Sequence, residues 1–306
     1  DLRVRGNAVI NGAVYGGAEN AQCYGVRTMI FTGGTVKGWV CAAANGTSNT
    51  NGDLTGTTYL YMGGNARVDS EGSHTVINRS VGGNVFAAGC GYQANNATSG
   101  LVRNGTNLVV ADNTYIERGA YGGGSYGFSA NTQTTNIFIT GGHVAGQNGG
   151  VNGINWDASV QGGVYGGACQ NVGGTINITM TGGLVEGGLY GGSNVTGTIG
   201  NNVTMKINGG QVGTEDKSAN IHGGGYGQDT KVSQNVEITL GKTSARDAEG
   251  VLVYGDVYGG SALGSVNGTA ATNTYHTYVT MNAGYIHGSL YGGALGNSTT
   301  AANVYG

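Results

Sequence analysis

Short runs in which apolar and polar residues alternate recur along the whole chain, and most of them end at a glycine pair. The clearest unit spans Thr175–Ser193. In it the run Thr-Ile-Asn-Ile-Thr-Met is followed by Thr-Gly-Gly-Leu-Val-Glu-Gly-Gly and then by Leu-Tyr-Gly-Gly-Ser. Alternation rich in β-branched residues is typical of a half-buried β-strand. The pattern therefore predicts short strands that are separated by glycine turns.

This unit aligns with itself about nine times between Leu2 and the end of the chain. Its aromatic position forms a column made up of Tyr15, Cys41, Phe86, Tyr121, Tyr165, Tyr190, His222, Tyr258 and Tyr291. The spacing ranges from 25 residues, between Tyr165 and Tyr190, to 45 residues, between Cys41 and Phe86. A fixed pattern with insertions of variable length is typical of a stacked repeat.

A stack of short strands fits these units better than a helical repeat, because so much glycine would destabilise helices. A single unit cannot bury its apolar face, whereas units stacked about 4.8 Å apart pair every strand with its neighbours. We therefore predict an all-β fold, a parallel β-solenoid (β-helix) of about nine coils. Residues 1–306 would form one continuous, elongated repeat array, as part of a longer chain or of a filament.

The composition agrees with such an array: glycine accounts for 65 residues, proline is absent and only 9% of the residues are charged. Collagen is excluded because glycine does not occur at every third position. Disorder is disfavoured because Val, Ile, Leu and Tyr recur at fixed offsets from the glycines. The net charge of -3 and the 13 Lys and Arg residues give no basic stripe, so we expect no nucleic-acid partner. No apolar run is long enough to predict a membrane span.

The glycine pair after the aromatic position has two explanations. It supplies either a positive φ angle or room for close approach of the backbone between coils. Ala42-Ala43 and Ala87-Ala88 replace the pair after Cys41 and Phe86, which favours limited space without deciding the matter. The aromatic column likewise has two interpretations: a structural ladder of stacked rings, or an exposed platform for sugar rings or a partner.

Several long insertions lie between the Gly-Gly and Tyr-Gly-Gly parts of the unit, at Asp69–Ser80, Gln147–Gln161, Thr214–Asn220 and Lys242–Asp256. Equivalent corners of stacked units lie along one edge, so these loops would line a single side. This candidate recognition edge contains Asp69, Glu71, His74, Arg79, Trp156, Asp157, Glu215, Lys217, Arg246 and Glu249. It is either a recognition surface or a set of solvated loops.

The sequence contains no recognisable motif for catalysis or cofactor binding. The strand runs contain no column with two acidic residues, and no calcium nonapeptide, GxSxG or GxxxxGK[ST] motif occurs. We therefore predict no catalytic residue, metal or cofactor.

The four cysteines, Cys23, Cys41, Cys90 and Cys169, show no metal-binding spacing and are interpreted as buried apolar residues or unpaired thiols. Cys90 and Cys169 both lie four residues after the aromatic column, but two coils apart. We expect them not to be bonded to each other, because two coils span about 10 Å.

The repeated segments TMTGGLVEGGLYGGS, INGGQVG, GDVYGGS and GSLYGGA resemble the Gly-rich "VYGG" repeats of large bacterial surface proteins, notably those of gut anaerobes. They are also similar to the wider class of β-helical adhesins and autotransporter passengers. The resemblance covers essentially all nine units. It implies a secreted or cell-surface location and a role as stalk, adhesin or fibre subunit.

Three functional hypotheses follow from the sequence. The first is a structural or adhesive β-solenoid without catalysis, whose partners are flanking repeats or further copies stacked end to end. The second is a module that binds glycans or another host-surface ligand. The third is a polysaccharide lyase or hydrolase with a site in the long loops. The unpaired strand edges expected at both ends favour some continuation of the stack.

Overall fold

The computed structural model describes residues 1–46, 52–70, 82–91, 99–125, 134–147, 162–241, 250–269 and 274–306. These residues form 28 β-strands and no helix, and all the strand pairs are parallel. The prediction of an all-β chain with parallel strands is confirmed. The described part of the chain contains no helix long and apolar enough to cross a membrane.

The first of three sheets has nine strands, one from each repeat unit, in the order β27-β23-β19-β16-β14-β12-β9-β6-β3. Their bounds are Val14–Tyr15 (β3), Val40–Cys41 (β6), Val85–Phe86 (β9), Gly119–Tyr121 (β12), Gly163–Tyr165 (β14), Leu189–Tyr190 (β16), Ile221–His222 (β19), Val257–Tyr258 (β23) and Leu290–Tyr291 (β27). We call each repeat unit a layer: it contains one of these strands, the chain segment that leads up to it and the turn that follows its aromatic position. The layers are numbered 1 to 9 from β3 to β27.

The second sheet has 15 strands. Their bounds are Leu2–Val4 (β1), Val9–Ile10 (β2), Arg27–Phe31 (β4), Thr35–Val36 (β5), Thr58–Met62 (β7), Arg67–Val68 (β8), Thr106–Val110 (β10), Tyr115–Ile116 (β11), Thr135–Val144 (β13), Ile176–Val185 (β15), Val203–Val212 (β18), Val236–Leu240 (β21), Leu252–Val253 (β22), Thr277–Met281 (β25) and Tyr285–Ile286 (β26). In layers 5 to 7 one ten-residue strand runs through the glycine pair, and in the others two strands flank the turn.

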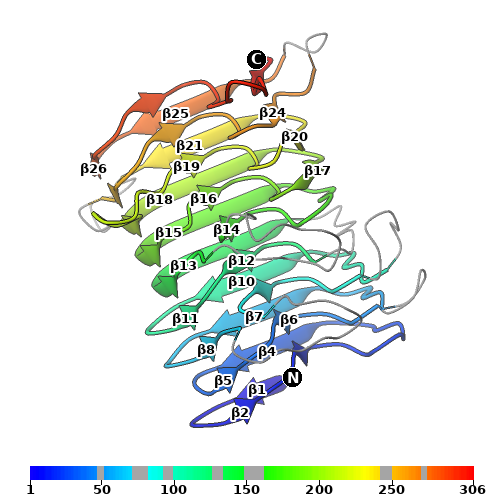
Figure 1. Ribbon diagram of the computed structural model, residues 1–306. Helices are drawn as coiled ribbons and strands as arrows, with labels where there is room; N and C mark the ends of the chain where they lie inside the picture. The colour runs from blue at the N-terminus through cyan, green and yellow to red at the C-terminus, as the bar shows by residue number, and fades with distance from the viewer. Residues whose placement is uncertain are drawn as a thin grey trace.

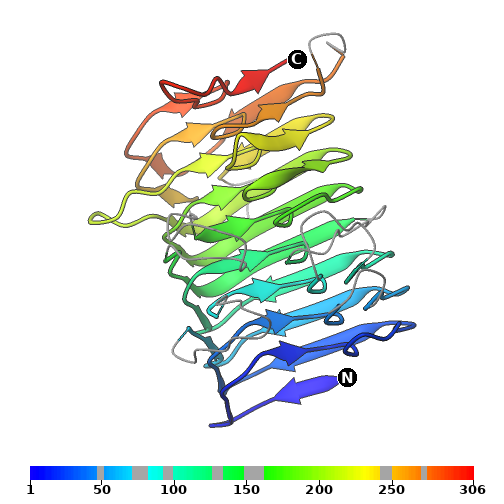
Figure 2. The ribbon, with the colours of Figure 1, turned by 45° about the vertical axis from the view of Figure 1, so that its right-hand side comes forward.

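A third, four-stranded sheet follows the aromatic position in the last layers, in the order β17-β20-β24-β28. Its strands are Thr196–Ile199 (β17), Asp229–Val232 (β20), Ser265–Val266 (β24) and Asn303–Val304 (β28). Figures 1 and 2 show the layers stacked one above another, from the N-terminus at the bottom to the C-terminus at the top. Neighbours in space are therefore equivalent residues of successive layers.

The core is a set of apolar columns that run through this stack. On the longer strands, alternate residues point inward: Met29 of β4 pairs with Leu60 of β7, which pairs with Leu108 of β10. All three are fully buried, and one continuous hydrophobic cluster extends from Val4 to Val266. The intervening residues of the same strands face outward, as period-two alternation requires.

Close packing between layers explains the glycine pair after the aromatic position. A Cβ atom added to Gly191 would overlap the carbonyl oxygen of Gly223 in the next layer and lie 2.5 Å from Cγ1 of Val203. Neither Gly191 nor Gly192 has a positive φ angle. Limited space, and not backbone conformation, therefore excludes side chains at this turn.

Candidate functional site

The nine residues of the aromatic column occupy equivalent positions of the nine-stranded sheet. The strand register pairs Tyr15 with Cys41 at one end, continues through every member in order, and pairs Tyr258 with Tyr291 at the other. From Phe86 onward the rings stack face to face. Their centroids lie between 4.7 Å, for Tyr165 and Tyr190, and 5.2 Å, for Tyr190 and His222. These distances match the spacing of neighbouring strands.

Most of this column is inside the protein. Its seven members from Cys41 to Tyr258 are buried, while Tyr15 is half-buried and Tyr291 is exposed. Burial raises the pKa of Tyr121 and Tyr165 well above the ordinary phenol value, so both rings stay neutral. Sugar rings have no access to these buried faces, so the column packs as an internal ladder.

His222 is the one titratable imidazole in the ladder. Its ring lies between those of Tyr190 and Tyr258, with centroids 5.2 Å and 4.9 Å away. Burial lowers the pKa of His222 to about 3, and Asp256 opposes the shift only in part. Its Nδ1 has no hydrogen-bond partner among the described residues. The imidazole therefore packs here as a neutral ring at neutral pH.

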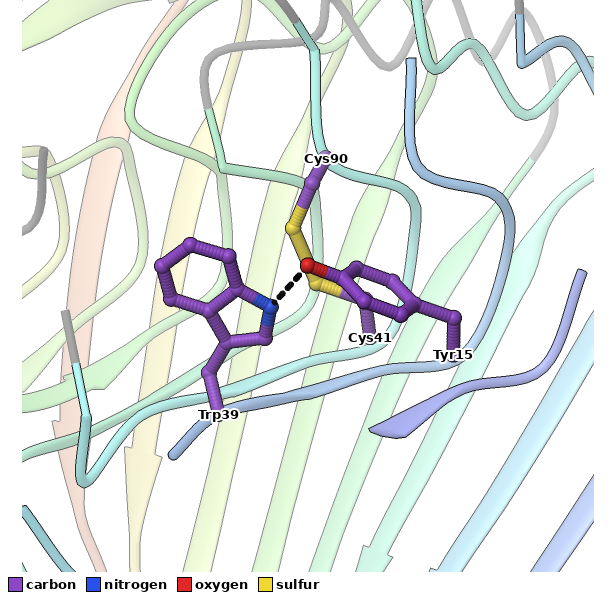
Figure 3. The surroundings of a disulfide bond; sticks show 4 residues. All are labelled: Tyr15, Trp39, Cys41 and Cys90. Carbon is purple, nitrogen blue, oxygen red and sulfur yellow. Dashed lines mark hydrogen bonds between the residues drawn. A yellow bond between two sulfur atoms is a disulfide. The ribbon is translucent and has the colours of Figure 1, made fainter. Parts of the chain in front are cut away.

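A disulfide joins Cys41 and Cys90, whose Cα atoms lie 6.5 Å apart. This corrects the interpretation of these two residues as unpaired thiols. Cys90 lies four residues after Phe86, where the chain pairs with Asn45 of the layer below. From there its side chain turns back toward the aromatic column and meets Cys41 of the neighbouring layer. Figure 3 shows the bond beside Trp39, whose indole N–H donates a 2.8 Å hydrogen bond to the Tyr15 hydroxyl.

The other two cysteines, Cys23 and Cys169, are buried and lie outside the disulfide. Cys23 Sγ accepts a hydrogen bond from the backbone N–H of Ala18. The expectation that Cys90 and Cys169 do not bond to each other is confirmed, since Cys90 is bonded to Cys41.

The candidate recognition edge falls mostly outside the described residues, namely Glu71, His74, Arg79, Trp156, Asp157, Arg246 and Glu249. Of its three described members, Glu215 is exposed and Lys217 is partly exposed. Asp69 is buried, and its carboxylate accepts a 3.1 Å hydrogen bond from Nε of Arg67. That this edge is a recognition surface therefore stays a prediction.

At the base of this edge the structure brings together ionisable side chains from five successive layers. We call Arg67, Asp69, Tyr115, His143, Glu186 and Lys217 the edge cluster. Arg67 lies over the ring of Tyr115, 4.1 Å from its centroid, and the rings of Tyr115 and His143 meet edge to face at 5.3 Å. His143 Nε2 lies 2.9 Å from Oε1 of Glu186, and Lys217 Nζ lies 3.5 Å from the other carboxylate oxygen.

The edge cluster balances its own charges. Glu186 has a basic partner on each oxygen, and Lys217 also donates a 2.7 Å hydrogen bond to the carbonyl of Ala145. Half-exposed ion pairs of this kind contribute little stability, so their main effect is to orient the side chains. Among the described residues, no three His, Cys, Asp or Glu side chains lie close enough together to hold a metal ion.

Tyr115, His143 and Glu186 are members that the sequence interpretation missed. A signal for them was present: each flanks the apolar residue of the strand after the glycine turn, at Ile116, Val144 and Val185. Alternation places such residues on the outer side of that strand. Parallel stacking aligns Tyr115 with His143, and Glu186 lies on the same side two positions beyond Leu184, the partner of His143. Aligning this strand across layers would have found the cluster.

Comparison of the chain with protein-family models, curated proteins and solved structures finds no significant match.

Proposed function

We propose that this chain is a parallel β-solenoid that serves as a structural or adhesive element at the cell surface or in the extracellular space, as in the "VYGG"-repeat proteins it resembles. The observation that carries the proposal is the in-register stack, in which one residue of every layer joins a single column from Tyr15 to Tyr291. Such an array extends by adding layers and keeps the same cross-section. That property suits a stalk, an adhesin shaft or a fibre subunit.

The Cys41–Cys90 disulfide supports an extracellular location, because disulfides form and persist mainly in oxidising compartments. The edge cluster supports a role without catalysis. Its acid and bases pair with one another, as His143 and Lys217 do with Glu186, and are not directed toward a common point outside the protein.

The purified chain tests this proposal by electron microscopy and light scattering, together with turnover assays on pectin and on host glycans. We expect elongated particles that associate end to end and hydrolyse or cleave none of these polymers. Turnover that is lost on substituting Glu186 or His143 would contradict the non-catalytic role. Compact particles that stay single at high concentration would contradict the role in fibres.

A further inference from the structure

The outward side of the large sheet carries a rigid surface, with few charges, that the structural role does not use. We propose that this face binds an uncharged, extended polysaccharide, whose sugar rings stack on Tyr59, Tyr61 and Phe138 and whose hydroxyls bond to the amides of Asn107 and Asn136. This site goes beyond the proposed structural function. It does not depend on end-to-end association.

Two outward columns cross strands β4 to β15 and form this sheet face. In one, Tyr59 pairs with Asn107, which pairs with Asn136. In the other, Tyr61 pairs with Val109, which pairs with Phe138. A groove of about 380 Å³ lies over β4, β7 and β10, and a second of about 270 Å³ lies over β13, β15 and β18. Both open on the same face, so a ligand that crosses the strands passes over both.

Tyr59 and Phe138 are open to solvent, Tyr61 is partly exposed, and the three are suitably spaced for sugar rings. Tyr59 is 48% exposed and Phe138 is 41% exposed. Tyr61 and Phe138 share a column two strands apart, which corresponds to roughly 10 Å. That separation is comparable to two sugar rings of an extended chain, so alternate rings can stack on the two side chains. Aromatic faces next to a few fixed polar groups are typical of small-molecule sites.

The polar groups of the face are held in a ladder. Asn136 Nδ2 donates a 3.0 Å hydrogen bond to Oδ1 of Asn107, and Asn177 Nδ2 donates one of 3.1 Å to Oδ1 of Asn136. Each amide has two N–H donors and two acceptor lone pairs. At Asn136 the ladder uses one donor, to Asn107, and one lone pair, from Asn177. The remaining donor and lone pair are oriented by the ladder and can meet a sugar hydroxyl.

Tyr61 is fixed in the same way. Its hydroxyl donates a 3.0 Å hydrogen bond to Oδ2 of Asp112. The same oxygen accepts a 2.7 Å hydrogen bond from the backbone N–H of Gly64. A side chain that is ordered before binding loses less entropy when a ligand arrives.

Charge complementarity selects the class of ligand. The outward residues of the two columns from β4 to β15 include no Asp, Glu, Lys or Arg. One cation, the exposed Lys206 of β18, lines the far end of the second groove, and Asp112 lies at the margin, bonded to Tyr61. An acidic polymer finds one basic partner, Lys206, at one end of the face and none over β4 to β15, whereas a neutral polymer loses no solvated charge.

Affinity electrophoresis of the 306-residue chain in mixed-linkage β-glucan, xyloglucan and galactomannan tests the site, with polygalacturonate as the charged comparison. We expect at least one neutral polymer to retard the chain. Tyr59→Ala and Phe138→Ala should each weaken binding by about tenfold or more, the usual effect of removing a central aromatic side chain. Tyr278→Ala is the matched control: Tyr278 is exposed in the same outward column as Tyr59, but on β25, away from both grooves.

A second measurement uses the unaltered chain and therefore does not depend on how the variants fold. Nitration of tyrosines, mapped by mass spectrometry, should be slowed by the bound glycan at Tyr59 and unchanged at Tyr278. The proposal is overturned if no neutral polymer retards the chain, if polygalacturonate alone does, or if Tyr278→Ala weakens binding as much as Tyr59→Ala. It is also overturned if Tyr59→Ala alters only the oligomeric state, which would make this face a contact between copies. None of these results bears on the structural role.

Discussion

At the scale of single residues, the choice of residue at a repeat position is governed by its packing against the equivalent residues of the neighbouring layers. His222 replaces a tyrosine in the aromatic ladder and stacks as a neutral ring between Tyr190 and Tyr258. Only glycine fits at position 191, because the next layer occupies the space that a side chain would need. Each case leads to a measurable consequence.

The burial of His222 should make stability depend on pH. Its pKa is lowered to about 3 in the folded chain and is near 6.5 in the unfolded chain. Between these values the unfolded state binds the extra proton, so stability falls as the pH falls through that window. His222→Phe keeps a stacked ring without the titrating group. Relative to this variant, the natural chain should lose about 2 kcal/mol of unfolding free energy between pH 6.5 and pH 5.

Denaturant unfolding at several pH values measures this difference. Tyr190→Phe is the control, since it alters the neighbouring ring and leaves the imidazole in place. It should keep the pH dependence of the natural chain. Parallel curves for the natural chain and His222→Phe would show that His222 is not responsible.

Gly191→Val should destabilise the protein by about 3 kcal/mol or more, because the added atoms would overlap Gly223 and Val203 and the layers cannot separate without losing strand pairing. Thermal unfolding measures the effect. Gly292→Val is the matched control: it follows Tyr291 in the same motif, and a Cβ atom there meets nothing within 4 Å. An equal loss of stability in the two variants would show that crowding is not the cause.

At the scale of strands, the disulfide connects β6 with the segment that follows the adjacent strand β9, where the aromatic ladder is interrupted. Cys41 is the non-aromatic member between Tyr15 and Phe86, and its bond to Cys90 joins layers 2 and 3 in place of ring stacking. Sequence separation between the two cysteines is 49 residues, so the bond closes a long loop.

Removing this bond should lower stability by about 2–4 kcal/mol, chiefly because the unfolded chain gains freedom when the loop opens. Thermal unfolding with and without reductant measures it: reductant should lower the melting temperature of the natural chain. The double variant Cys41→Ser, Cys90→Ser should melt at a lower temperature and respond little to reductant. An equal response of both proteins to reductant would point to some other target of the reagent.

At the scale of the whole molecule, the same columns that build the interior reach the surface at the last layer. Leu290 and Tyr291 are 44% and 45% exposed, whereas Val257 and Tyr258, their partners in layer 8, are buried. Their columns begin at Val14 and Tyr15 in layer 1. A second copy placed end to end would bring Leu290 and Tyr291 toward Val14, which is buried in the single chain, and toward the half-buried Tyr15, in the geometry of an open, head-to-tail assembly.

If the 306-residue chain associates in this way, Leu290→Glu should weaken the association, because it places a charge in the apolar contact. Light scattering over a range of concentrations measures the change. Thr140→Glu is the control, since Thr140 is exposed on β13 in layer 5 and adds the same charge far from both ends of the stack. Equal association of both variants would argue against stacking through this layer.

The sequence by itself predicted the strands, their parallel pairing and the members of the aromatic column. These features follow from local patterns: alternation decides which residues of a strand point inward, and the turn motif marks the same position in every unit. Equivalent residues then become neighbours through stacking alone, whatever the length of the insertions between them. For this reason Tyr165 could be aligned with Tyr121 across 44 residues.

The tertiary structure decided what depends on the direction of side chains around turns and between layers. Cys90 meets Cys41 because its side chain points back toward the aromatic column, and no spacing pattern shows that direction. The partners of Glu186 are His143 and Lys217, which come from other layers and from other positions of the repeat. Contacts of this kind are set by three-dimensional packing, so residues that lie far apart in sequence and share no motif position meet only in the folded chain.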